Sequence, residues 1–265
     1  MLNLHQLEAV LRIARAAGDA IMAVYEGHGG TVGDITHKSD GSPLTLADTA
    51  AHRLIVAGLA GLENAWPVVS EEDAASHAYR TCNDRYWLVD PLDGTKEFLN
   101  RNDEFTVNIA LIDAGTPVAG VVVAPALRLA YWGAPGLGAW RDAGAGPVPL
   151  AVSGRGVQSA LRVIASRSHM DDATRDYLQG LGDHTLIQAG SSLKFCRIAE
   201  GAADLYPRFG PTCEWDVAAA HAILAAAGGQ VLCLDGKPLR YGKTDVLNPP
   251  FVACCGNMPN HERTR

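Results

Sequence analysis

The chain has 265 residues, 48% of them hydrophobic, and its 22 basic and 29 acidic residues leave a net charge of −7. A chain of this length and apolar content can bury a full core, as one large domain or as two packed ones. The acidic balance argues against a nucleic-acid groove or a polybasic membrane patch, but a bound metal can still attract an anionic substrate.

The cellular location is predicted from the N-terminus and the cysteines. The chain opens with Leu4, Leu7 and Leu11 among polar residues rather than with a basic leader, and no run is long and uncharged enough to span a bilayer. The six cysteines show no CxxC spacing, which is typical of buried free thiols in a reducing compartment. We therefore expect a cytoplasmic protein with no integral membrane segment and no nucleic-acid partner.

The first predicted elements are two amphipathic helices. The first has Asn3 as its N-cap and ends at glycines from Gly27, and its apolar positions recur every three or four residues: Leu4, Leu7, Leu11, Ala14, Ile21 and Tyr25. A polar loop over 38–43 separates it from the second helix, which starts at Thr45 and runs to about Leu62.

Strand-like runs follow and predict a meander of antiparallel or mixed strands. They cover 68–69, 86–89, 106–112, 120–123, 129–133 and 138–141. The Gly-, Pro- and Ala-rich segment 142–149 is the predicted boundary between two sub-domains. In the second half, extended segments at 161–165, 185–187 and 204–207 alternate with helices at 171–181, 192–200 and 216–227, a pattern that indicates α/β layers.

The strongest chemical motif is the run from Asp90 to Thr95. It places two aspartates after a buried strand, separated by Pro91 and Leu92 and followed by Gly94. Proline fixes φ and lacks an N–H, so the strand cannot continue unchanged; we expect the chain to turn there and direct both carboxylates, with the Leu92 carbonyl, to one point.

A second acidic pair, Glu71-Glu72, ends the preceding apolar run. Neighbouring strand residues point to opposite faces, so only one of these glutamates is expected to face the aspartates. Carboxylates at the ends of adjacent buried strands repel each other unless a cation lies between them, and hard oxygen ligands suit Mg²⁺. The sequence therefore predicts a metal-dependent enzyme that acts on phosphate.

Three further motifs have both a structural and a chemical interpretation. Thr45 and Asp48 form a capping-box pattern, and the same pair could orient a water molecule. Asp216 belongs to an acidic helix start that the helix dipole favours in any case. The segment 190–192 with Lys194 could supply amides, hydroxyls and charge to an anion, or could be an ordinary loop-to-helix junction.

A covalent mechanism is less consistent with the spacing of the aspartates. Haloacid-dehalogenase-type phosphatases carry D-x-D-G-T, in which the first aspartate is the nucleophile. Here two residues separate Asp90 from Asp93. Because a phosphoaspartyl mechanism needs its nucleophile and acid/base at a fixed offset, the spacing favours a metal-activated water.

Taken together, these segments resemble the lithium-sensitive, Mg²⁺-dependent phosphatase superfamily of the inositol monophosphatases, and within it the bacterial 3′(2′),5′-bisphosphate nucleotidases. The resemblance spans 18–249. It is carried by Asp-Gly-Thr-Lys-Glu-Phe at 93–98, Glu-Phe-Thr-Val-Asn-Ile-Ala-Leu-Ile at 104–112, Gly-Ser-Ser-Leu-Lys-Phe-Cys at 190–196 and Leu-Tyr-Pro-Arg-Phe-Gly-Pro-Thr at 205–212. Lys96 and Glu97 are the part specific to the nucleotidases. Cys213 departs from the pattern, where a bulkier or amide residue is usual.

The resemblance implies an α/β (α+β) fold, a layered αβαβα sandwich with sub-domains 1–145 and 146–265 and the site between them. It implies two or three Mg²⁺ ions, held by Glu71, Asp90, the Leu92 carbonyl, Asp93 and Asp216. It also implies that Thr95, helped by Glu71, orients or deprotonates the attacking water, and that Thr45 and Asp48 handle water nearby. The implied substrate contacts are Glu71, Leu92, Asp93, Gly94, Thr95, Gly190, Ser191, Ser192, Lys194, Arg208 and Asp216.

The activity implied is hydrolysis of adenosine 3′,5′-bisphosphate to AMP and phosphate, with its sulfated derivative PAPS as a further substrate, as a step in sulfur metabolism. Lithium sensitivity and peripheral association with the inner membrane belong to the same resemblance. The alternatives are an inositol or other sugar phosphatase on the same metal site, and a non-catalytic scaffold that binds RNA or a protein.

Overall fold

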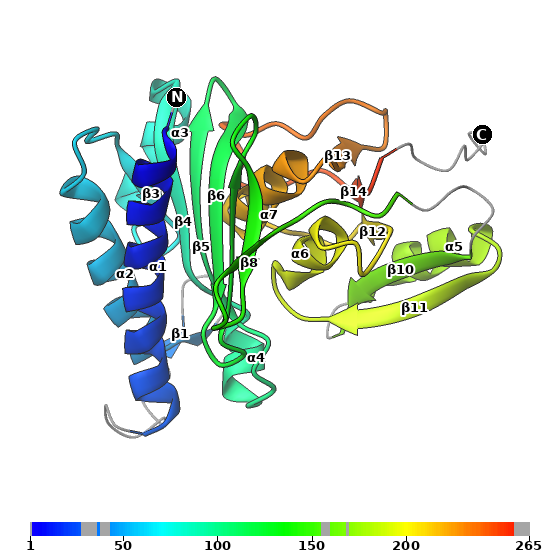
Figure 1. Ribbon diagram of the computed structural model, residues 1–265, viewed down its shortest axis with the longest axis horizontal. Helices are drawn as coiled ribbons and strands as arrows, with labels where there is room; N and C mark the ends of the chain where they lie inside the picture. Colours follow the sequence, from blue (N-terminus) through cyan, green and yellow to red (C-terminus); the bar gives the residue numbers. More distant parts are fainter. Residues whose placement is uncertain (1, 28–35, 38–42, 155–159, 168–169, 257–265) are drawn as a thin grey trace.

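The computed structural model describes residues 2–27, 36–37, 43–154, 160–167 and 170–256. Within these residues two large sheets lie at an angle to each other, with helices between and outside them (Figure 1). The seven-stranded sheet has the order β3-β4-β5-β6-β7-β8-β9, and the five-stranded sheet has the order β11-β10-β12-β14-β13.

The strands of the larger sheet are β3 (Val68–Ser70), β4 (Arg85–Asp93), β5 (Thr106–Asp113), β6 (Thr116–Ala124), β7 (Leu129–Ala134), β8 (Gly138–Asp142) and β9 (Pro147–Pro149). Those of the smaller are β10 (Leu161–Ser166), β11 (His184–Ala189), β12 (Leu205–Arg208), β13 (Gln230–Cys233) and β14 (Phe251–Cys254). A two-residue pair, β1 (Thr36–His37) and β2 (Pro43–Leu44), precedes them.

The helices are α1 (Leu4–Tyr25), α2 (Leu46–Ala60), the 3₁₀ helix η1 (Ala74–Ala78), α3 (Tyr79–Cys82), α4 (Thr95–Leu99), α5 (Asp172–Gly180), α6 (Leu193–Ala199) and α7 (Glu214–Ala226). Helices α1 and α2 cover one face of the larger sheet, α6 and α7 lie between the two sheets, and α5 covers the outer face of the smaller sheet (Figure 1). This confirms the predicted αβαβα sandwich.

Local sequence signals account for the helix starts. Asn3 and Gln6 form a reciprocal capping box at α1, as do Thr45 and Asp48 at α2. Gly27, just beyond α1, has φ of +84°. Of the predicted loop 38–43, residues 38–42 lie outside the described ones.

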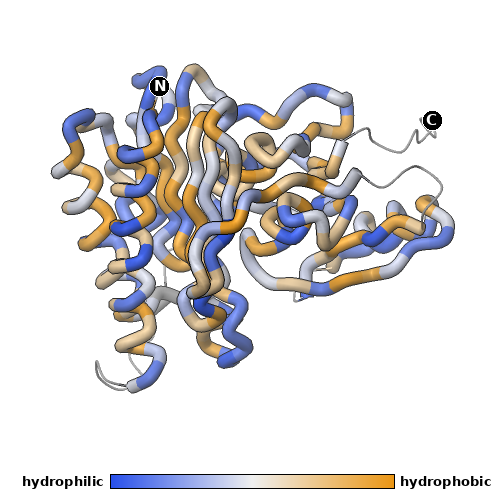
Figure 2. The backbone as a smooth tube through the Cα atoms, in the orientation of Figure 1, coloured by the Kyte–Doolittle hydropathy of each residue, from blue (hydrophilic) through white to orange (hydrophobic). Residues whose placement is uncertain are grey.

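Burial follows the predicted apolar patterns. Figure 2 shows hydrophobic residues along the strands of the larger sheet, and the buried ones form one core beneath α1 and α2 and another around α6 and α7. The six cysteines are free thiols, as predicted, but only Cys196 and Cys254 are buried, and Cys82 is exposed. Among the described residues, no helix is both long and apolar enough to cross a bilayer.

Three local predictions need correction. β4 does not leave the sheet at Pro91 but runs on to Asp93, and the effect of the proline is a shift in its register with β5 between Asp90 and Asp93. Glu71 and Glu72 do not end a strand, because β3 stops at Ser70 and both glutamates lie in the turn after it. Strands β13 and β14 were not predicted.

The segment 142–149 also differs from a plain linker. Pro147–Pro149 pairs with β8 as the seventh strand of the larger sheet, so the chain passes to the smaller sheet only after Pro149. The division into sub-domains at residue 145 stays a prediction.

Candidate active site

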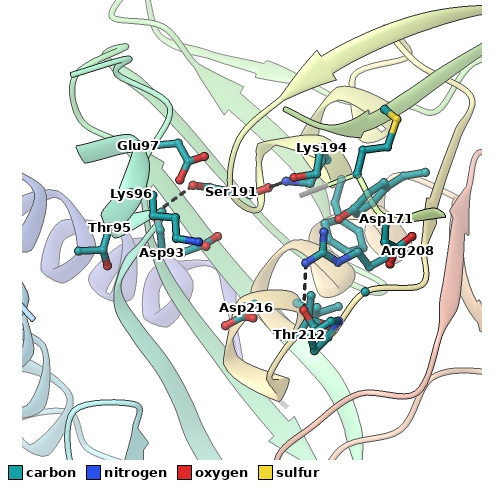
Figure 3. A pocket seen from close by; sticks show the side chains of 18 residues that line it. Asp93, Thr95, Lys96, Glu97, Asp171, Ser191, Lys194, Arg208, Thr212 and Asp216 are labelled. Carbon is teal, nitrogen blue, oxygen red and sulfur yellow. Dashed lines mark hydrogen bonds between the residues drawn. The ribbon is translucent and has the colours of Figure 1, made fainter. Parts of the chain in front are cut away.

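A cavity of about 620 Å³ opens between the end of β4 and the elements of the smaller sheet. Its lining includes residues 93–97 from the first half of the chain and Ser191, Lys194, Arg208 and Asp216 from the second half. Figure 3 shows Asp93 and Asp216 on one side of this space and Lys194 and Arg208 across it. We call the side with Asp93 and Asp216 the acidic wall and the side with Lys194 and Arg208 the basic wall; Lys96 also lines the first side and Asp171 the second.

Asp93 is held by donors from two other segments. Its Oδ2 accepts the Ser192 amide at 2.7 Å, Asn108 Nδ2 at 3.3 Å and Thr106 Oγ1 at 3.4 Å. Burial raises the pKa of Asp93 to about 6, against the lowering effect of Lys194 and of these hydrogen bonds. The carboxylate is thus fixed in direction before any ligand binds.

Thr106 and Asn108 were not among the predicted site residues. They lie on β5 opposite Asp93 and Asp90 in the antiparallel register. Both are buried and polar within an otherwise apolar strand, and they alternate along it. That alternation was the one sequence signal that could have revealed them.

Asp216 completes the acidic wall, and Asp90 and Glu71, which do not line the cavity, interact with the charges of Asp93 and Asp216. Asp90 is 2% exposed, and its side chain is hydrogen-bonded to Glu71. Burial, followed by the charges of Glu71 and Asp93, holds the pKa of Asp90 well above its usual range. Burial and then the charges of Asp93 and Glu71 do the same to the pKa of Asp216. Glu71 rather than Glu72 therefore faces the aspartates.

Asp216 comes from a different layer of the fold. It is in the first turn of α7, where its Oδ2 accepts the Cys213 amide at 2.8 Å and completes a capping box. The structure brings it to Asp93 across more than 120 residues of chain.

Lys194 is the buried cation of the cavity. Its side chain is 6% exposed, and Nζ donates to the Ser191 carbonyl at 2.5 Å. Burial lowers the pKa of Lys194 to about 8, although Asp93 acts in the opposite direction. Arg208 lies farther out and donates from Nη2 to the Pro211 carbonyl at 2.9 Å. Lys194 and Arg208 thus bring positive charge to the cavity that Asp93 and Asp216 also line.

Gly94 and Thr95 occupy the turn between β4 and α4. Gly94 has φ of +91°, and a Cβ there would stand 2.3 Å from Ser191 Oγ, so this position accepts only glycine without rearrangement. Thr95 Oγ1 donates to the Leu92 carbonyl at 3.4 Å. Both residues line the cavity.

The remaining predicted residues lie behind the cavity wall. Asp48 Oδ2 accepts both the Thr45 amide at 2.8 Å and Thr45 Oγ1 at 2.5 Å, which accounts for the pair as a helix cap. The Gly190 amide donates to Glu104 Oε2 at 2.8 Å, and the Ser192 amide donates to Asp93. The amides of Gly190 and Ser192 therefore hold carboxylates of the protein itself.

The donor set fits a hard divalent cation in its chemistry. Every candidate ligand is an oxygen: four carboxylates and the Leu92 carbonyl. Burial first, and then the charges of the neighbouring carboxylates, raise the pKa values of Asp90 and Asp216. Among the described residues, however, no three such side chains already stand as a ready metal-binding group.

Comparison with known proteins defines the class. The model of the inositol monophosphatase family matches residues 3–263. The chain belongs to this family, which confirms the predicted superfamily.

The particular relatives are nucleotidases. The chain is 52% identical over 246 residues to the 3′(2′),5′-bisphosphate nucleotidase CysQ of Salmonella typhimurium, covering 92% of this chain and 98% of that protein. The crystal structure of CysQ from Bacteroides thetaiotaomicron matches with a TM-score of 0.83 at 40% identity, covering 95% of this chain and 97% of that one. An inositol monophosphatase from Anabaena matches with a TM-score of 0.74 at 25% identity, covering 97% and 92%. The predicted resemblance to bacterial bisphosphate nucleotidases is confirmed.

Proposed function

We propose that this protein is a Mg²⁺-dependent phosphatase that hydrolyses adenosine 3′,5′-bisphosphate to AMP and phosphate. The observation that carries the proposal is the buried carboxylate wall facing Lys194 and Arg208, in a chain 52% identical to a named bisphosphate nucleotidase. A substrate with two phosphate groups suits this arrangement, because one can meet the acidic wall through a cation while the other meets the basic wall.

The proposed metal ligands are Glu71, Asp90, the Leu92 carbonyl, Asp93 and Asp216, with two or three ions. Bound Mg²⁺ would neutralise charge on the scissile phosphate and activate the attacking water. The hydrogen bonds that Ser192, Asn108 and Thr106 donate to Asp93 would keep its carboxylate aimed at the metal position.

The proposed catalytic residues act on the water and the phosphate. Thr95, with Glu71, would orient the water and take its proton, and the turn at Gly94 would let the phosphate approach the backbone. Thr45 and Asp48 would handle water at the start of α2. Across the cavity, Ser191, Lys194 and Arg208 would hold the nucleotide, with Gly190 and Ser192 supporting them from behind.

The test is phosphate release from adenosine 3′,5′-bisphosphate in Mg²⁺, with PAPS, inositol 1-phosphate and fructose 1,6-bisphosphate in parallel. We expect the highest kcat/KM on the nucleotides. A preference for inositol 1-phosphate would be consistent with the proposed metal chemistry but would contradict the proposed substrate. No hydrolysis of any of the four, with RNA or a protein bound instead, would favour a scaffold.

An Asp93→Asn variant is the matched blank for this assay. Asparagine keeps the size and one acceptor oxygen of Asp93 but loses the charge that would bind the cation. Because losing even a partner of a metal ligand typically costs about 10–100-fold, we expect activity to fall by more than about a hundredfold. Activity within about tenfold of the wild type would contradict the assignment of Asp93 as a metal ligand.

The remaining properties that the resemblance implies stay predictions. They are a cytoplasmic location, peripheral association with the inner membrane, lithium sensitivity and a part in sulfur metabolism. Inhibition of phosphate release by added LiCl, with NaCl as the control, tests the third of these directly.

A further inference from the structure

The first turn of α7 carries a glutamate that the proposed chemistry does not use. Glu214 is 0% exposed and lies two residues before Asp216. Its Oε2 accepts Arg80 Nη1 at 2.9 Å and the Gly242 amide at 3.1 Å. Its Oε1 accepts the Lys243 amide at 3.1 Å and Lys243 Nζ at 2.5 Å. Groups of the protein itself therefore bind both carboxylate oxygens of Glu214.

Arg80, the partner of Glu214, belongs to the segment that carries Glu71. It lies in α3, which directly follows η1, and η1 begins three residues after Glu71. The Arg80 side chain is 3% exposed, and Nη1 also donates to the Lys243 carbonyl at 3.0 Å. The Arg80–Glu214 pair is thus a buried, charged link between segments 134 residues apart.

His77 makes a second link between the same two segments. Its Nε2 lies 3.0 Å from the carbonyl oxygen of Ser70, the residue before Glu71. Its ring centroid lies 4.9 Å from that of Trp215, the residue before Asp216. His77 therefore contacts the chain neighbours of both carboxylates.

We propose that the Arg80–Glu214 pair is a clamp that sets the position of Asp216 relative to Glu71 and thereby the affinity for Mg²⁺. The inference rests on the proposed function, because it takes Glu71 and Asp216 as metal ligands. These two carboxylates come from different layers and repel each other without a cation. The opposite-charge pair, with Arg80 nine residues after Glu71 and Glu214 two residues before Asp216, ties the two segments together, which makes Arg80 and Glu214 positioning residues.

A purely structural role is the competing explanation. Buried ion pairs are weak evidence for net stability, and removing one partner destabilises a protein wherever the pair lies. Loss of activity alone therefore cannot identify a clamp. The deciding quantity is Mg²⁺ affinity, measured without substrate on folded protein.

The experiment is calorimetric titration of MgCl₂ into the metal-stripped full chain, for the wild type, Glu214→Gln and Arg80→Lys. Glutamine keeps the size and one acceptor oxygen of Glu214, so this variant tests charge and geometry with the least disruption. Melting in EDTA, followed by circular dichroism, ensures that each protein is folded at the titration temperature.

Arg162→Lys is the matched control. Arg162 makes a comparable pair with Asp204, with Nη2 to Oδ1 at 2.6 Å and side chains 22% and 6% exposed. That pair joins β10 to the residue before β12 in the smaller sheet and touches none of the proposed ligands. The Arg162→Lys variant therefore shows how the disruption of an ion pair elsewhere in the fold changes the Kd for Mg²⁺ and the melting temperature.

We expect the Kd for Mg²⁺ to rise at least about tenfold in Glu214→Gln and Arg80→Lys, and less than about twofold in Arg162→Lys. In turnover assays the Mg²⁺ half-saturation point should rise in parallel, with an unchanged KM for substrate at saturating Mg²⁺. A wild-type Kd in both clamp variants, with only the melting temperature lowered, would overturn the clamp and leave the proposed function intact. A wild type that binds no Mg²⁺ would overturn both.

Discussion

At the scale of single residues, the acidic wall combines carboxylates that are strongly held with carboxylates that repel. Asp93 receives three side-chain or amide donors, whereas Asp90 is buried against Glu71 and receives the Leu92 amide at 3.0 Å. Such an arrangement lowers the stability of the folded protein in the absence of a cation, and the binding of a cation offsets that loss. Two substitutions follow from this balance.

Asp90→Asn should stabilise the metal-free protein. The pKa of Asp90 is raised in the folded state, so ionisation of Asp90 at pH 7.5 favours the unfolded state. The cost is roughly 1.4 kcal/mol for each unit by which folding raises the pKa. Asparagine removes that charge and keeps an oxygen for the Leu92 amide. Urea unfolding in EDTA should therefore give a higher free energy of unfolding for the variant, and in MgCl₂ the order should reverse. A variant less stable in EDTA would contradict the repulsion.

Gly94→Ala should cost both stability and activity. A residue with a Cβ at φ of +91° costs about 1–2 kcal/mol, and this Cβ would also stand 2.3 Å from Ser191 Oγ. Gly136→Ala is the control, because φ there is +87° with nothing within 4 Å of the new Cβ. Chemical unfolding of both variants should show the larger loss at Gly94, and only Gly94→Ala should lower kcat/KM. Equal losses would mean that Ser191 moves aside freely.

At the scale of elements, α7 is the helix on which the site and the core both depend. It lies between the sheets, packs on β4, β5, β6 and β7, and presents Asp216 from its first turn (Figure 1). Its approach to the larger sheet is very close: a Cβ on Gly120 of β6 would stand 2.0 Å from the Ala219 carbonyl oxygen. The position of the metal site thus depends on a helix-to-sheet distance that a single methyl group would change.

Gly120→Ala should displace α7 from the sheet. The clash is with backbone atoms, which cannot rotate away, so we expect a loss of about 3 kcal/mol in the free energy of unfolding. Mg²⁺ affinity should fall as well, because Asp216 moves with the helix. Gly154→Ala, where nothing lies within 4 Å, is the control and should change neither quantity. A stable variant with normal Mg²⁺ affinity would show that α7 tolerates the shift.

At the scale of the whole molecule, stability should depend on pH through a buried histidine that is none of the proposed metal ligands. His221 of α7 is 7% exposed, and its Nδ1 lies 2.9 Å from the Tyr241 hydroxyl. Burial lowers the pKa of His221 to about 4. The unfolded chain binds this proton below about pH 6.5 and the folded protein does not, so stability falls as the pH drops from 6.5 towards 4.

At pH 5 this histidine should cost about 2 kcal/mol relative to pH 7.5. His221→Asn keeps an acceptor near the Tyr241 hydroxyl but cannot be protonated. Urea unfolding in EDTA at the two pH values should show a smaller decrease for the variant than for the wild type. The carboxylates titrate in both proteins, so the difference between the two decreases in unfolding free energy is the contribution of His221. Equal decreases would contradict a buried neutral histidine.

The sequence by itself determined the features that depend on residues close together in the chain. The N-cap at Asn3, the capping box at Thr45 and the run from Asp90 to Thr95 are each complete within six residues, so their chemistry is readable without a fold. The periodicities of the first helices and of strands β4 to β8 are equally local. The family resemblance extended this information to distant residues such as Asp216, but only as expectation.

The tertiary structure alone decided which distant groups meet. It placed Asn108 beside Asp93 and buried Glu214 against Arg80. It also showed that Pro91 shifts the register of β4 without ending the strand. These contacts depend on strand register and on the packing of α7 between two sheets, and a change of one residue in register would turn every such side chain to the other face. Spacing along the chain carries no information about that choice.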